Sequence, residues 1–356
     1  MAAKLAVHPP VPPMEAQTVG HVPAGPGWLY EPKWDGFRCL VFRDLGKVEL
    51  QSKSCRSLTR YFPELVQAAL ALPVRRFVLD GEIMVPQAGV FSFDALLQRI
   101  HPAESRVKRL AAETPAQLLA FDLLADAQGR SLIEVPLRER RAQLESFAGK
   151  YLQNSASIRL SPATTNLAEA KAWLEGIGRG LDGIIAKPCA MTYRSGERSG
   201  MQKIKLHRTA DCVVGGFRYN EGRPVAGSLL LGLYDDQGLL NHVGFAANIA
   251  ASDKPALTAR LKKLIAPPGF TGRAPGGPSR WSSARSNDWE PLKPKLVVEV
   301  SYDHVSGGRF RHGTKLLRWR PDKSPRLCTM EQLRQPRAGL SKLLQYYLAR
   351  VASVSR

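Results

Sequence analysis

The stretch EPKWDGFRCLVFRD, residues 31–44, places charged side chains on both sides of a single glycine. Glu31, Lys33 and Asp35 share parity, so in an extended segment their side chains point to one side. A lysine is a nucleophile only when deprotonated, and desolvation or nearby cations favour that form. Lys33 is therefore a candidate nucleophile, with a surface Lys-x-Asp-Gly turn as the alternative interpretation of this stretch alone.

The sequence around this stretch predicts a mixed first domain. Residues 46–52 and 77–85 have the alternation and β-branched content of strands. Residues 58–72, 101–113 and 166–176 have helical patterns. Because strands and helices do not alternate regularly, an α+β fold is favoured over a doubly wound sheet. The predicted boundaries are an extended, proline-rich arm over 1–27 and the mixed domain over 28–206.

A second domain is predicted after residue 206. Short apolar runs separated by Gly, Asp or Pro, with one helical interlude over 252–265, suggest a small β-barrel over 207–335. Apolar residues from Leu340 to Val351 recur at helical spacing. This pattern predicts an amphipathic C-terminal helix or tail over 336–356.

Further polar residues interrupt apolar strands. Asp80 and Glu82 lie on one face of the strand FVLDGEIMV, where carboxylates indicate either a polar site or a water-facing edge. Lys203 and Lys205 share one face of MQKIKL, and two like charges side by side favour an anion between them. The other polar positions are Phe121 and Asp122 in AFDLLA, Asp182 and Lys187 in LDGIIAKP, and Arg320, Asp322 and Lys323 in RWRPDK.

The charge of the chain points to a polyanionic partner. The 356 residues carry a formal net charge of +20, with 51 Lys and Arg against 31 Asp and Glu. The part after residue 206 has 24 of the basic but only 11 of the acidic residues. This second part is therefore the better candidate for contacts with a nucleic-acid backbone.

Composition also excludes several classes. The sequence contains no run of 18 apolar residues, so a membrane-spanning helix is not expected. The first residues contain no apolar segment typical of a signal peptide. The five cysteines are scattered and form no CxxC pair, so a disulfide framework or thiolate zinc site is not expected. We expect a monomer in the reducing bacterial cytoplasm, associated with the nucleoid.

Taken in order, KxDGxR, DGE, FDL, DGIIAK, KxK and RxDK resemble the motif set of the covalent nucleotidyltransferases. EPKWDGFR, LDGIIAKP and RFRHGT followed by RWRPDK most resemble the short bacterial C-type ATP-dependent DNA ligases, over roughly residues 28–335. The resemblance implies an α+β nucleotidyltransferase (adenylation) domain followed by an OB-fold domain. It also implies sealing of 5′-phosphate/3′-hydroxyl nicks in duplex DNA through a lysyl-AMP and a DNA-adenylate.

The resemblance assigns roles to particular residues. Lys33 accepts AMP from ATP, and Lys187, Lys203 and Lys205 contact phosphate. Arg38 and Glu82 hold the ribose, Phe121 stacks on adenine, and Glu31 lies beside the base. Asp35 and Asp182 contact Mg²⁺, with Mn²⁺ as an alternative, and Mg²⁺ requires few protein ligands. Arg320, Asp322 and Lys323 orient the leaving pyrophosphate, which requires the second domain to close and reopen; Asp211 is the expected hinge position.

Three departures and three alternatives accompany the resemblance. Asp182 replaces a common Glu, and Met201 replaces a common Trp. Lys53, a predicted binding residue, stands where many ligases have Arg; a lysine keeps the charge but lacks the bidentate fork, so a weaker contact to DNA or ribose is expected. An RNA ligase, a GTP-dependent capping guanylyltransferase and a non-catalytic DNA-binding relative share parts of the pattern. Expected partners are nicked duplex DNA and, in end joining, a Ku-like end binder or a primase-type polymerase acting in DNA repair and recombination.

Overall fold

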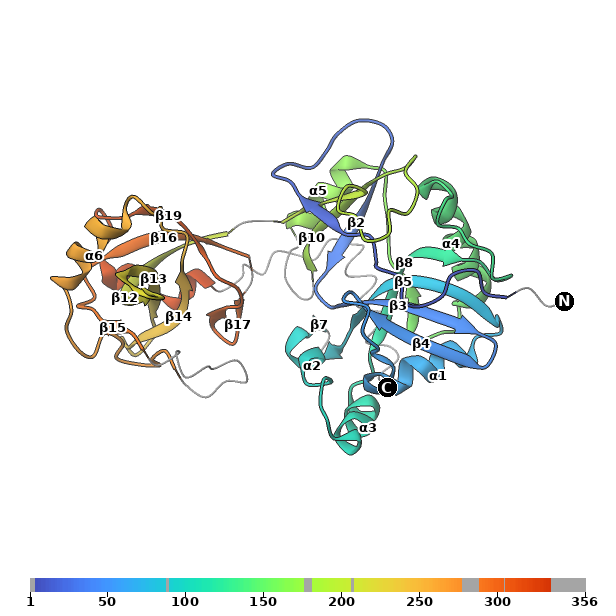
Figure 1. The fold of residues 1–356 in the computed structure, drawn as a ribbon, viewed down its shortest axis with the longest axis horizontal. Helices are drawn as coiled ribbons and strands as arrows, with labels where there is room; N and C mark the ends of the chain where they lie inside the picture. Colours follow the sequence, from blue (N-terminus) through green and yellow to red (C-terminus); the bar gives the residue numbers. More distant parts are fainter. Residues whose placement is uncertain are drawn as a thin grey trace. The chain divides into compact units, whose positions relative to one another are not determined.

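The computed structural model describes residues 4–87, 90–175, 181–205, 208–276, 288–303 and 305–333. The chain forms two compact units that divide between residues 206 and 207 (Figure 1). Each unit has its own hydrophobic core. Among the described residues, no helix has the length and apolar character needed to cross a bilayer.

The first unit contains a five-stranded sheet in the order β4-β3-β5-β8-β9. All neighbours are antiparallel except β8 and β9. Every residue of β8 is buried, because the strand lies inside the sheet beside helix α4. The strands are β3 (Phe37–Asp44), β4 (Lys47–Ser52), β5 (Arg76–Met84), β8 (Gln117–Ala125) and β9 (Ile158–Leu160), and the helices around them are α1 (Pro63–Ala71), α2 (Phe93–Leu97), α3 (Glu104–Glu113) and α4 (Leu137–Tyr151).

A second, four-stranded sheet of this unit has the order β1-β11-β10-β2. Helix α5 (Leu167–Glu175) packs on β10 and β2 through the fully buried Trp173. The short strand β1 pairs in parallel with β11, so residues from the proline-rich arm belong to the first unit. The strands are β1 (Ala16–Thr18), β2 (Trp28–Trp34), β10 (Leu181–Pro188) and β11 (Met201–Ile204).

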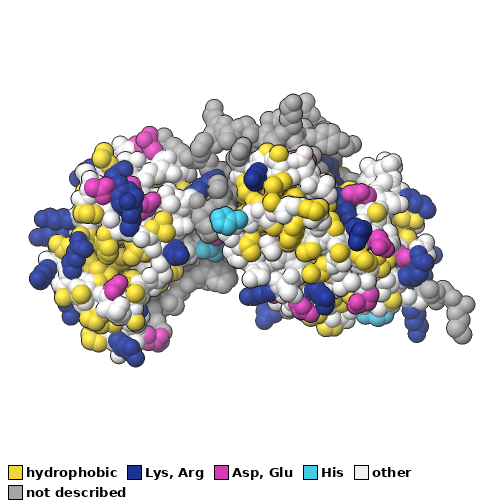
Figure 2. Space-filling view, turned by 90° about the horizontal axis from the view of Figure 1, so that it is seen from above, with side chains coloured by type: hydrophobic (Ala, Val, Ile, Leu, Met, Phe, Trp, Pro, Cys, Tyr) yellow, Lys and Arg dark blue, Asp and Glu magenta, His cyan; other side chains and the backbone are white. Residues whose placement is uncertain are grey.

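The second unit is built on one curved sheet in the order β14-β13-β12-β16-β19, with β15 also paired to β12. Its core combines aliphatic side chains with buried aromatic ones such as Phe217 and Phe310, and helix α6 (Lys254–Lys262) packs against β13. The strands are β12 (Arg208–Asn220), β13 (Arg223–Tyr234), β14 (Leu240–Ala246), β15 (Glu290–Pro291), β16 (Val297–Tyr302) and β19 (Lys315–Trp319). Lys and Arg side chains stand out on the surface of this unit, at the left of Figure 2.

Several short elements complete the two units. They are the pairs β6 (Pro86–Gln87) with β7 (Val90–Phe91) and β17 (Val305–Ser306) with β18 (Arg309–Phe310), and the 3₁₀ turns Thr59–Tyr61, Pro325–Leu327 and Met330–Leu333.

The predicted elements mostly form at the expected places. The helix predicted over 58–72 is interrupted, because Pro63 begins α1 only after a separate 3₁₀ turn. The edge-strand interpretation of Asp80 and Glu82 is wrong, since β5 lies between β3 and β8. Helix α4 was not expected, because Arg140 and Arg141 lie on its buried face and interrupt the apolar pattern by which a helix is recognised in sequence. The helix predicted over 336–356 lies outside the described residues.

Candidate active site

Lys33 lies on β2 and faces an acidic residue of the neighbouring strand. The Nζ atom of Lys33 lies 2.5 Å from Oδ2 of Asp182, and Nζ of Lys205 lies 3.0 Å from the same oxygen. The register of β2 and β10 shifts between Leu181 and Gly183, directly at Asp182. Burial alone would raise the pKa of Asp182, but Lys33 and Lys205 outweigh it and lower the pKa. Asp182 thus stays ionised and holds two lysines.

Glycines at two motif positions allow this close packing. A Cβ at Gly36 would collide with the backbone oxygen of Ile83 on β5. A Cβ at Gly183 would collide with the backbone oxygen of Ile204 on β11, and Gly183 has φ of +150°, which side chains rarely adopt. The glycines of both Asp-Gly pairs therefore let neighbouring strands approach the lysine.

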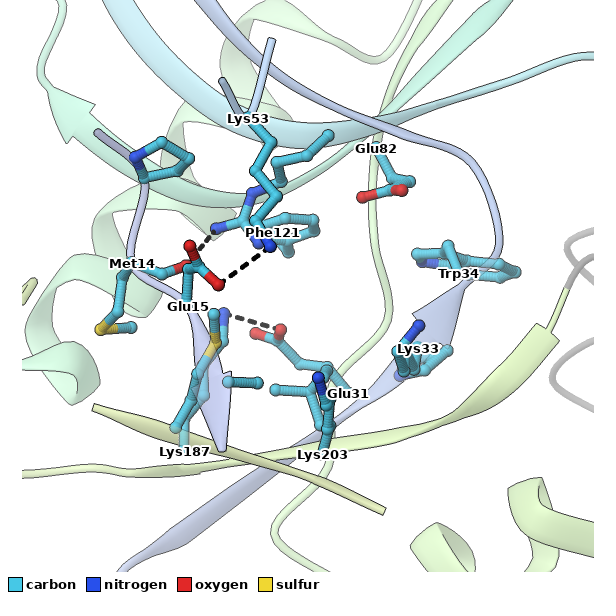
Figure 3. A pocket seen from close by; sticks show the side chains of 16 residues that line it. Met14, Glu15, Glu31, Lys33, Trp34, Lys53, Glu82, Phe121, Lys187 and Lys203 are labelled. Carbon is cyan, nitrogen blue, oxygen red and sulfur yellow. Dashed lines mark hydrogen bonds and ion pairs between the residues drawn. The ribbon is translucent and has the colours of Figure 1, made fainter. Parts of the chain in front are cut away.

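Lys33 borders a cavity of about 220 Å³ in the first unit (Figure 3). Residues from both sheets and from the arm line it. Eight of the predicted site residues do so: Glu31, Lys33, Arg38, Lys53, Glu82, Phe121, Lys187 and Lys203. A second cavity of about 810 Å³ shares Glu15, Arg38, Lys53 and Glu82 with the first. The two cavities therefore adjoin at these four residues.

A buried ion pair forms one side of the first cavity. Nζ of Lys187 lies 2.7 Å from Oε2 of Glu31, and both side chains are only 2% exposed. The other carboxylate oxygen of Glu31 accepts no hydrogen bond from the described residues. The ring of Phe121 lies close to this pair, with Lys187 Nζ 4.8 Å and the Arg38 guanidinium carbon 4.5 Å from its centroid. Both cations lie within the range of cation–π attraction.

Arg38 is fixed by a carboxylate that the site predictions did not include. Its guanidinium donates two hydrogen bonds to the fully buried Asp80, at 2.5 and 2.6 Å. The Tyr193 hydroxyl donates a third to Asp80, at 2.7 Å. Arg38 lies directly opposite Glu82 in the β3–β5 register. Burial raises the pKa of Glu82 to about 7, against the opposing effects of Arg38 and Lys33.

Three further charged residues of the site predictions, Lys203, Lys53 and Asp35, differ in their relation to the cavity. Burial and the neighbouring Lys33 and Lys205 lower the pKa of Lys203. Lys53 pairs with Glu15 of the arm at 2.9 Å. Asp35 follows β2 and is not among the lining residues of the cavity. Groups of three or more His, Cys, Asp and Glu arranged to bind a metal do not occur in the described ranges.

The predicted residues of the second unit form a compact ionic cluster. Arg320 Nη1 lies 2.9 Å from Asp211 Oδ1, and Lys323 Nζ lies 3.3 Å from Asp211 Oδ2. Arg320 also contacts Asp322 at 2.8 Å, which lowers the pKa of Asp322 to about 2. Asp211, expected only as a hinge position, therefore joins two residues of the RWRPDK motif.

Sequence reasoning missed several residues of the site. Met14 and Glu15 come from an arm without periodicity, Trp34 and Ile185 resemble ordinary strand residues, and Tyr193 lies in a loop. The one available signal was Asp80, which lies with Glu82 in a largely apolar strand. The others reach the site through contacts between distant segments.

A carboxylate-bound lysine beside a cation-rich cavity, on a mixed domain followed by a β-sheet domain, is the arrangement expected of a nucleotidyltransferase. The sequence models for the ATP dependent DNA ligase domain and the ATP dependent DNA ligase C terminal region match residues 13–205 and 222–323. The chain therefore belongs to the family of ATP-dependent DNA ligases, as the ordered motifs predict.

Known proteins agree with this assignment. DNA ligase C2 of Mycolicibacterium smegmatis is 46% identical and the match covers 93% of this chain and 96% of the relative. The non-homologous end joining DNA repair protein LigD of Mycobacterium tuberculosis is 33% identical over 84% of this chain and 37% of LigD. A solved Lig E DNA ligase is similar in fold, with a TM-score of 0.56 at 15% identity, covering 86% of this chain and 98% of that one.

These similarities confirm the predicted family, the ATP dependence and the two-domain fold class. They also bear on two of the alternatives that share parts of the motif pattern. The matched models describe DNA ligases, and so they favour the predicted DNA ligase over an RNA ligase or a capping guanylyltransferase.

Proposed function

We propose that this chain seals 5′-phosphate/3′-hydroxyl nicks in duplex DNA, with Lys33 as the residue that carries AMP. The observation that supports this most directly is the position of Lys33. It borders a cavity that Arg38, Lys53, Lys187 and Lys203 also line, and Asp182 holds its amine. Such a site attracts a polyphosphate and presents a nitrogen nucleophile to it.

In the first step, the lone pair of the neutral Lys33 amine attacks the α-phosphorus of ATP. A nitrogen–phosphorus bond forms, the bond from phosphorus to the bridging oxygen breaks, and its electrons leave with pyrophosphate. Lys203 and Lys205 flank Lys33 and neutralise the charge that develops on the phosphate oxygens. Asp182 orients Lys33 by accepting a hydrogen bond from its Nζ atom, and the proton that the nitrogen loses as the new bond forms passes to water.

The nucleoside fits the residues on the opposite side of the cavity. The Oε1 atom of Glu31 lies 3.9 Å from Arg141 Nη1 but accepts no hydrogen bond from the described residues, so it is a buried acceptor suited to an amino group of a base. Phe121 offers an aromatic surface for stacking, and the adenine has to share that ring with Arg38 and Lys187. Arg38 and Glu82, opposite each other on neighbouring strands, are suited to the ribose hydroxyls.

The donor set of the site also fits a magnesium ion. The acidic side chains near Lys33 offer only carboxylate oxygens, and Mg²⁺ binds through one or two carboxylates, phosphates and waters. Asp182 and Asp35 would hold it, and Mn²⁺ suits the same oxygen donors. The ion would supply neutralising charge between phosphates.

The later steps transfer AMP to the DNA. The 5′-phosphate oxygen at the nick attacks the phosphorus of lysyl-AMP, and the nitrogen–phosphorus bond returns its electrons to Lys33. The 3′-hydroxyl oxygen then attacks the activated 5′-phosphate, loses its proton, and AMP departs. Arg320 and Lys323, both held by Asp211, provide the second unit with phosphate contacts for the pyrophosphate of the first step.

The DNA substrate suggests a cellular setting. The similarity to a protein named for non-homologous end joining favours a role in break repair. We expect the chain to act as a monomer at the bacterial nucleoid. A Ku-like end binder or a primase-type polymerase is the partner that we expect in that setting.

Transfer of labelled AMP tests this function. Incubation with ATP labelled at the α-phosphate should leave one acid-labile AMP on the wild-type protein and none on Lys33→Ala. Label from GTP but not from ATP would instead indicate a capping enzyme. Nicked duplexes with DNA or RNA on either side of the nick then define the substrate, and sealing of DNA nicks is the expected result.

A further inference from the structure

The acidic residues around the nucleotide cavity differ in how firmly they hold their cations. Asp182, Glu31 and Asp80 pair with Lys33, Lys187 and Arg38, and all three acids are at most 10% exposed. Glu15 is different. Its side chain is 26% exposed, and its two partners, Lys53 and Arg198, are 59% and 74% exposed. Water therefore reaches this one pairing, and it is the one that a ligand opens at least cost.

The backbone holds Glu15 at this place. The amide of Glu15 donates to the Glu197 oxygen at 2.8 Å, and the amide of Met14 donates to the Tyr193 hydroxyl at 3.1 Å. The next residue, Ala16, begins β1 and pairs with Met201 of β11. The carboxylate thus projects toward Lys53 from the residue that directly precedes β1, as Figure 3 shows.

Glu15 also lies where the two cavities adjoin. It lines the 220 Å³ cavity beside Lys33 and the 810 Å³ cavity beside Ser52 and Arg56. One oxygen of its carboxylate, Oε2, lies 2.9 Å from Lys53 Nζ and 3.1 Å from Arg198 Nε. A phosphate oxygen makes the same contacts with the same cations.

We propose that Glu15 occupies the place of a substrate phosphate, holding Lys53 and Arg198 until a phosphate oxyanion of the DNA or the nucleotide displaces it. This inference rests on the proposed function and names the residue that sets how tightly this site binds phosphate. Release of the carboxylate frees two cations for the incoming group. The carboxylate returns when the phosphate leaves, which favours product release.

Binding measurements on Lys33→Ala, which cannot form lysyl-AMP, test this without any chemical step. Removing the negative charge with Glu15→Gln should tighten binding of a phosphate-bearing ligand about three- to tenfold, because the competing ion pairs are exposed and weak. Three ligands are compared: ATP, a nicked duplex with a 5′-phosphate and the same duplex with a 5′-hydroxyl. Tighter binding confined to ATP identifies the nucleotide phosphates, and a gain that requires the 5′-phosphate identifies the nick. A gain shared by both duplexes identifies the DNA backbone.

A matched control separates this effect from the change in net charge. Glu104 pairs with Lys108 on the exposed surface of α3, so Glu104→Gln removes one surface charge away from the cavity. The effect of Glu15→Gln should exceed that of Glu104→Gln and should vanish in a Lys53→Gln/Arg198→Gln background. A gain no larger than the control, or one that persists without the two cations, overturns the proposal.

A second measurement does not depend on how well the Glu15 variant folds. Lys53→Gln/Arg198→Gln alone, with Glu15 intact, should weaken binding of the same ligand about tenfold. Unchanged binding would show that these cations do not contact phosphate, and the proposal then fails. Labelling of wild-type Lys33 by ATP reports the proposed function separately, so the two failures are distinguishable.

Discussion

The Nζ atom of Lys33 lies 2.5 Å from Oδ2 of Asp182, although 149 residues separate them in the chain. Asp182→Asn keeps the shape of the side chain but removes the charge that Lys33 and Lys205 share. Adenylation should slow by about 10²-fold, since a misplaced nucleophile costs about this much. The rate of lysyl-AMP formation, from single-turnover labelling, measures this effect. An unchanged rate would exclude Asp182 from orienting Lys33.

Asp80 accepts hydrogen bonds from Arg38 and from the Tyr193 hydroxyl. Loss of the Asp80 carboxylate should therefore affect folding as well as binding. Asp80→Asn removes one partner of a buried pair and should lower the free energy of unfolding by about 3 kcal/mol. Denaturant titration measures it. Tyr193→Phe, which removes only one hydrogen bond, is the control and should cost about 1 kcal/mol. Equal losses for the two variants would contradict the central role of the Arg38–Asp80 pair.

Glu82 should make stability depend on pH. Burial raises its pKa in the folded chain from 4.5 to about 7, so the folded state binds this proton more tightly than the unfolded state. The contribution to stability is fully present below about pH 4.5 and is lost as pH rises through about 7. Glu82→Gln, which cannot ionise, should gain stability relative to wild type between pH 5 and pH 8. Melting temperatures across this range test the sign, and a constant difference would contradict it.

The basic surface should make nick binding depend on salt. If about six to eight of the basic residues after residue 206 reach phosphates, a plot of log affinity against log salt should have a slope of about −5 to −7. Binding isotherms at several salt concentrations give the slope. A slope near zero would mean that the excess basic residues face water and do not contact DNA phosphates. Sequence preference should be weak, because backbone contacts carry no base information.

Lys33 and Arg320, for which we propose different steps, can be tested together. Lys33→Ala should abolish adenylation, whereas Arg320→Ala should slow the same step about 10²-fold and leave sealing of pre-adenylated nicked DNA largely intact. The measurement is the ratio of the two rates. Equal losses in both reactions would show that Arg320 serves every step rather than the first one.

Much of the site could be predicted from sequence because its motifs lie within single strands. Glu31, Lys33 and the Asp-Gly turn, or Asp182 and Lys187, are fixed in spacing by the local period of a strand. Order along the chain then identified the family, and the two-domain division followed from the change in texture near residue 206. These features depend on residues close together in the chain.

Only the tertiary structure decided which charges pair. Asp80 with Arg38, Asp211 with Arg320 and Glu15 with Lys53 are contacts between distant segments. Their partners depend on strand register and on the path of the arm, and a strand's own period does not determine either one. The sequence by itself identified the ligase family and predicted Lys33 as the nucleophile. The packing of the two sheets and the arm determined which carboxylate holds each cation, because burial and distance set the strength of every pair.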